Sequence, residues 1–152
     1  MSLMTAFRFM DVALWHMPFR QRQMQRCLGT DGHYLYFDAL KLIERYREGR
    51  NELLRDYLHC ILHCVFRHQF DEKHPEAGLW DVACDVAVEA TAMELCALRF
   101  PSPQDDDRKR VLTRVEKACG VLTAQRMYRS SVTGRQRDDC QGVDRLGGFE
   151  PQ

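Results

Sequence analysis

Two histidines, His59 and His63, stand four residues apart in an apolar stretch of the chain, and a third, His68, follows them. Residues i and i+4 lie on the same face of an α-helix, so the two imidazoles can reach a common point. This is the spacing of the zinc-protease motif H-E-x-x-H, whose glutamate acts as a general base on metal-bound water. The spacing therefore predicts a zinc site with His59 and His63 as ligands. The alternative is a pair of packed or hydrogen-bonded histidines.

The position of the catalytic glutamate is occupied by Cys60. A thiol is a poor general base for water, and a thiolate would tend to bind the metal itself. The common role of a cysteine on an apolar helix is that of a small buried side chain. The sequence thus predicts the frame of a metallopeptidase without its general base. On this interpretation, replacing Cys60 with glutamate is expected to restore zinc-dependent hydrolysis.

Further metal ligands are expected from a second helix and from His68. Catalytic zinc takes three protein ligands, so a carboxylate should join the two histidines. Asp81, Asp85 and Glu89 follow at four-residue spacing; we expect Asp85 as a ligand and Glu89 as the alternative base, unless the three form a solvated acidic face. His68 lies about 140° around a straight helix from His63. It can join the site only if the helix ends beforehand; otherwise it is a charge near the helix C-terminus.

The elements that position these residues are mainly helical, and the expected fold class is α+β, mainly α, with one small β-hairpin. Asp38 is expected to cap a helix that turns Leu40, Ile43 and Tyr46 inward and stops at Gly49. Asn51 should cap the histidine helix, with Val65 and Phe66 on its apolar side. The remaining helices are expected over 3–17, 79–100, 103–119 and 123–128, and the hairpin strands over 24–28 and 33–37.

The composition excludes several classes of function. The 152 residues carry 22 basic and 22 acidic side chains, so no net charge favours nucleic acid or an anionic membrane. The seven cysteines form no C-x-x-C pair, which indicates reduced thiols of a cytoplasmic protein. Residues 1–129 are expected to form one domain and residues 130–152, polar and glycine-bearing, a linker or tail.

Four motifs in succession resemble a known family: the turn at 29–32 (GTDG), the strand at 34–37 (YLYF), the histidine segment at 59–68 (HCILHCVFRH) and the helix at 80–89 (WDVACDVAVE). They are similar to the bacterial metallopeptidase-like domain that precedes a von Willebrand factor A-like domain. That family's pattern is a TDG turn, H-E-x-x-H-x-x-x-x-H and then W-N-x-A-x-D-x-x-x-N. The resemblance covers about residues 18–95.

The resemblance implies a zincin-like helical domain that binds zinc through His59, His63, His68 and Asp85, with Cys60 and Glu89 departing from the family pattern. It also implies that the chain is part of a longer protein, with a C-terminal von Willebrand factor A-like domain and an AAA+ ATPase as partners. The expected function is a degenerate metallopeptidase domain that binds metal, or a peptide or protein ligand. The alternatives are an active zinc peptidase with another base and a metal-free helical interaction module.

Overall fold

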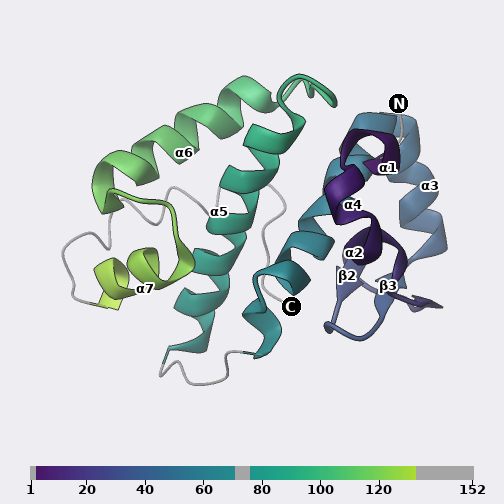
Figure 1. Cartoon of the computed structure of the whole chain (residues 1–152), viewed down its shortest axis with the longest axis horizontal. Helices are drawn as coiled ribbons and strands as arrows, with labels where there is room; N and C mark the ends of the chain where they lie inside the picture. The colour runs from purple at the N-terminus through teal and green to yellow at the C-terminus, as the bar shows by residue number, and fades with distance from the viewer. Residues whose placement is uncertain (1–2, 71–75, 133–152) are drawn as a thin grey trace. The chain divides into compact units, whose positions relative to one another are not determined.

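The computed structural model describes residues 3–70 and 76–132 (Figure 1). The chain divides into two compact units, residues 1–71 with 95–102 (the first unit) and residues 72–94 with 103–152 (the second unit). The first unit begins with α1 (Leu3–Ala6), the 3₁₀ turn η1 (Arg8–Met10) and α2 (Asp11–Trp15). It continues with β1 (Phe19–Gln21), β2 (Leu28–Thr30), β3 (Leu35–Phe37), α3 (Ala39–Glu48), α4 (Arg50–Val65) and η2 (His68–Phe70). The second unit holds α6 (Asp105–Cys119), α7 (Ala124–Val132) and all but the end of α5 (Ala77–Cys96).

The described residues are mainly helical with one small sheet, so the predicted fold class is confirmed. The sheet has the order β1-β3-β2, with β2 and β3 antiparallel as the predicted hairpin requires. The first hairpin strand was predicted too early, because β2 begins at Leu28. Strand β1, which pairs with β3 in parallel, was not predicted. Three exposed residues give no alternation of apolar and polar side chains from which such a strand could be recognised.

Helix α3 is capped as predicted but exposes the face that was expected to be buried. The Asp38 carboxylate accepts hydrogen bonds from the backbone N–H groups of Leu40 and Lys41, and the helix stops before Gly49. Leu40, Ile43 and Tyr46 are 74%, 49% and 54% exposed, so the predicted inward face was wrong. Polar contacts hold this helix instead, since Arg45 of α3 forms ion pairs with α4. Its Nε lies 2.6 Å from Asp56 Oδ2 and its Nη2 lies 3.3 Å from Glu52 Oε2.

Helix α4, which carries the histidines, is held in the first unit by a buried apolar stripe. Leu58, Ile61 and Leu62 are at most 2% exposed and follow the i, i+3, i+4 spacing of one helix face. The helix begins at Arg50 after Gly49, so the predicted cap at Asn51 was wrong; the Asn51 amide donates instead to the carbonyl of Pro101. Val65 and Phe66, expected to be buried, are exposed because the helix ends at Val65.

The predicted first helix over 3–17 is broken into α1, η1 and α2. The break falls at Phe7, whose backbone is not helical and whose side chain is fully buried. Its ring lies 6.1 Å from that of Phe100, centroid to centroid. Burial of this aromatic side chain outweighs the continuation of a regular helix.

The second unit has its own apolar core between α5, α6 and α7. Trp80 and Tyr128 meet edge to face, with ring centroids 5.8 Å apart. Gly120 ends α6 with φ of 86°, as its type predicts. Helix α5 ends at Cys96, four residues before its predicted end. Residues 130–132 of the predicted tail belong to α7, and the rest of the tail lies outside the described residues.

None of the helices over residues 3–70 and 76–132 combines the length and the apolar character that crossing a bilayer requires.

Candidate metal centre

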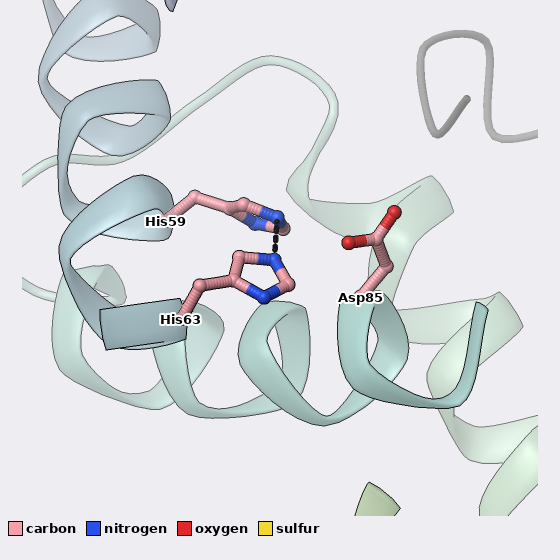
Figure 2. A group of neighbouring side chains, drawn as sticks. All are labelled: His59, His63 and Asp85. Carbon is pink, nitrogen blue, oxygen red and sulfur yellow. Dashed lines mark hydrogen bonds between the residues drawn. The ribbon is translucent and has the colours of Figure 1, made fainter. Parts of the chain in front are cut away.

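The two histidines project from one face of α4 and meet at their ring tips (Figure 2). The Nε2 atoms of His59 and His63 are 3.0 Å apart, and the ring centroids are 4.8 Å apart. Both side chains are half-buried, beside the apolar stripe of the same helix. The helix therefore fixes the backbone of both residues, and their four-residue spacing brings the imidazoles together as predicted.

The separation of the two nitrogens matches what one shared metal ion needs. Zinc binds imidazole nitrogen at about 2.0–2.1 Å, so two ligands at the tetrahedral angle stand about 3.3 Å apart. The observed 3.0 Å is close to this value without any change of backbone. The same distance suits a single N–H···N hydrogen bond between neutral rings, which is the metal-free alternative.

His68 returns to the pair because α4 ends before it. Arg67 has φ of 60°, a left-handed turn, and η2 begins at His68. The Nδ1 atom of His68 lies 3.3 Å from Nδ1 of His63. This is the nitrogen of His63 opposite to the one that faces His59. The structure thus brings His68 to the predicted site, as a hydrogen-bond partner of His63.

The GTDG turn packs against this end of the histidine helix. The Thr30 hydroxyl donates to the Tyr34 carbonyl and lies 3.6 Å from the Cys64 sulfur, one residue beyond His63. A Cβ on Gly32, whose φ is 84°, would come within 2.8 Å of the Phe70 ring in η2. Glycine is therefore needed here both for its backbone conformation and for its size. The motif positions the segment that carries His68.

Cys60 is a buried thiol, 8% exposed, inside the first unit. Burial, followed by the negative charge of Asp56 and the nearby thiols of Cys27 and Cys64, raises its pKa well above the usual range. A protonated thiol neither accepts a proton from water nor binds a metal as thiolate. The predicted role as a small buried side chain is confirmed, and no base stands at the position next to His59.

The three acidic side chains belong to the part of α5 in the second unit. Glu89 is 7% exposed, and its carboxylate lies 3.3 Å from the guanidinium of Arg108. The Glu89 carboxylate is therefore engaged by a neighbouring side chain of the second unit. Asp85 is labelled in Figure 2 and carries an oxygen of the type zinc accepts.

Comparison of the chain with protein-family models, with curated proteins and with solved structures finds no match.

One surface of the first unit was not predicted from the sequence. Arg20 of β1 lies over the ring of Tyr34, just before β3, and Arg22, just after β1, lies over the ring of Tyr36 in β3. The signal in the sequence is the alternation of arginine and glutamine after Phe19, together with two tyrosines spaced by two. The parallel pairing of β1 with β3 places the arginines and the tyrosines on one face of the sheet, and this pairing is not encoded in either segment alone.

Proposed function

We propose that this chain is a degenerate, zincin-like metallopeptidase domain that binds zinc and holds a peptide or protein partner without hydrolysing it. One observation carries the proposal: the Nε2 atoms of His59 and His63 stand 3.0 Å apart on one helix face, close to the separation of about 3.3 Å expected of two ligands on one zinc ion.

Asp85 is the proposed third ligand. It corresponds to the aspartate of the second helix in the family that the chain resembles, and its carboxylate is a donor that zinc accepts. Two imidazole nitrogens and one carboxylate oxygen are a donor set that zinc uses in catalytic sites, with a fourth position left for water or a bound group. The chemistry of the three side chains supports zinc over calcium or magnesium, which prefer oxygen ligands.

His68 has a positioning role in this proposal. A neutral imidazole carries one N–H, so a His63 that binds metal through Nε2 carries its proton on Nδ1. That proton is then donated to Nδ1 of His68, 3.3 Å away. Such hydrogen bonds fix the ring orientation and the protonated nitrogen of metal-bound histidines. His68, predicted as a ligand, is therefore proposed to hold His63 in place.

The lack of hydrolysis follows from the residues at the base positions. Cys60 is a protonated, buried thiol, and Glu89 is engaged by Arg108. When bound, zinc would act as a Lewis acid toward a carbonyl of the partner, and no side chain described above is placed to take a proton from water. We also propose a cytoplasmic location, from the unpaired pattern of the cysteines in the sequence, and, from the resemblance, a longer protein with a von Willebrand factor A-like domain and an AAA+ ATPase partner.

The test is zinc content measured together with cleavage. The chain purified with zinc should retain about one equivalent after dialysis, as three-ligand sites do, measured by inductively coupled plasma mass spectrometry. His63→Ala and Asp85→Asn should lose it, whereas His16→Ala, at an exposed histidine of the first unit, should not.

Casein should stay intact with the zinc-loaded chain. Cleavage that a chelator abolishes would establish the active peptidase instead. A wild-type chain that retains no zinc would establish the metal-free interaction module.

A further inference from the structure

Arg20 of β1 and Arg22, the residue directly after β1, are exposed and have no carboxylate partner within residues 3–70 and 76–132. By contrast, Arg45 in the same unit forms three ion pairs with nearby carboxylates. The guanidinium carbon of Arg20 lies 3.6 Å from the ring centroid of Tyr34, and that of Arg22 lies 5.7 Å from the centroid of Tyr36. Cation–π contacts hold both groups on the sheet while their N–H donors stay available to a ligand.

The tyrosines beneath the arginines are themselves anchored. The Tyr36 hydroxyl donates to one carboxylate oxygen of Asp31, 2.8 Å away. The other oxygen accepts from the backbone N–H groups of His33 and Tyr34. Both oxygens of Asp31 are thus engaged by the Tyr36 hydroxyl of β3 and by two backbone N–H groups, and neither forms an ion pair with Arg20 or Arg22.

Among the described residues, no strand pairs with the outer edge of β1, beside these arginines. Strand β1 is the end strand of the sheet, and its bonds to β3 run through Pro18 and Arg22: the Leu35 N–H donates to the Pro18 carbonyl and the Arg22 N–H to the Phe37 carbonyl. In a parallel ladder, alternate residues bond to the same neighbour, so Phe19 and Gln21 direct their N–H and C=O groups away from β3. An unpaired edge of this kind is a template for another extended chain.

We propose that the outer edge of β1 binds an extended acidic peptide segment by strand addition, with acidic side chains at alternate positions paired to Arg20 and Arg22. Side chains alternate between the two faces of a strand, so residues two apart on the ligand lie opposite the two arginines. The residue opposite Phe19 should be apolar. Phe19 is 60% exposed, and its ring stacks on Tyr57 with centroids 6.3 Å apart, which leaves an aromatic surface for contact.

A peptide fits this surface better than a nucleic acid. The faces of Tyr34 and Tyr36 are already covered by the arginines, so these rings are not free to stack on bases. The free N–H and C=O groups of β1 match those of another polypeptide backbone. The chain also has no net positive charge to attract a phosphate backbone.

The proposal is tested by fluorescence anisotropy with the full chain and a labelled peptide that alternates glutamate with valine or threonine. EDTA is present, so that the result does not depend on the proposed zinc site. A peptide of the same composition with its glutamates grouped together keeps the charge but not the spacing. Arg20→Ala with Arg22→Ala should weaken binding roughly threefold to thirtyfold, the range for two exposed ion pairs.

Two variants separate strand addition from simple charge attraction. Gln21→Pro removes an outward N–H that β3 does not use, and it should weaken binding about twofold to tenfold, as one lost hydrogen bond does. Arg110→Ala, at a 75% exposed arginine of the second unit, should leave binding unchanged. Circular dichroism checks that each variant is folded.

Three results would overturn the proposal. The first is equal binding of the grouped-glutamate peptide. The second is equal weakening by the Arg110 variant. The third is a single-stranded oligothymidine that binds more tightly than the alternating peptide, which would make this face a nucleic-acid surface.

Discussion

Replacing Cys60 with glutamate tests whether residue 60 of α4 faces the histidine site or the buried interior of the first unit. From sequence alone, this change restores the H-E-x-x-H motif and should produce zinc-dependent hydrolysis. The structure leads to a different expectation, because Cys60 is 8% exposed and lies near Asp56, Cys27 and Cys64 inside the first unit. Glutamate at this position would be a buried carboxylate close to another carboxylate. We therefore expect Cys60→Glu to destabilise the chain and not to activate it.

The size of the effect has two parts. Adding atoms to a packed interior costs typically 1–3 kcal/mol, so about this much is expected from volume alone. Leaving a buried charged group without a full set of hydrogen bonds adds about 1–3 kcal/mol or more. Arg26 is close enough to lower the pKa of the thiol slightly and would offset part of the second term. The sum is about 2–6 kcal/mol, a large share of the 5–15 kcal/mol by which domains are stable.

Urea unfolding followed by circular dichroism measures the two parts separately. Cys60→Gln has nearly the volume of the glutamate variant without its charge, so it should lose about 1–3 kcal/mol of unfolding free energy. Cys60→Glu should lose at least about 1 kcal/mol more at pH 7. A glutamate variant as stable as the wild type would contradict the expected destabilisation. Cleavage of casein by that variant in the presence of zinc would also contradict the expected lack of activation.

Two further predictions concern groups whose pKa the fold changes. Burial, the negative charge of Asp56 and a hydrogen bond to it raise the pKa of Cys27 to about 11. The thiol should therefore react with iodoacetamide about a hundredfold more slowly at pH 8 in the folded chain than in the urea-unfolded chain. Mass spectrometry of peptides measures the two rates, and equal rates would contradict the raised pKa. For Asp38, desolvation raises the pKa but hydrogen bonds from the N–H groups of Met24, Lys41 and Leu40 outweigh it, so the net shift is downward. The contribution of Asp38 to stability is therefore complete above its unfolded pKa and is lost as pH falls through its folded pKa. Asp38→Ala should lower Tm at pH 7, and its Tm should converge with that of the wild type in acid. A difference in Tm that persists in acid would show that the charge is not the cause.

The sequence by itself determined the features that depend on residues close together in the chain. The four-residue spacing of His59 and His63 fixes their common face wherever α4 lies, and Asp38 caps α3 through its nearest N–H groups. Gly120 stops α6, and Asp31 and Gly32 of the predicted turn lie in the connection between the two antiparallel strands, whereas Gly29 and Thr30 belong to β2. Each of these rests on backbone geometry or on contacts a few residues apart, which a local pattern encodes.

The tertiary structure decided the features that depend on distant residues. His68 contacts His63 because the chain makes a left-handed turn at Arg67, and no local sequence pattern predicted this turn. The exposure of α3 follows from ion pairs between Arg45 and α4, and the arginine surface follows from the parallel pairing of β1 with β3. A helical period tells which residues share a face but not what that face meets. Packing between segments far apart in the chain sets which face is buried, and it buries Cys60 while it leaves Leu40 exposed.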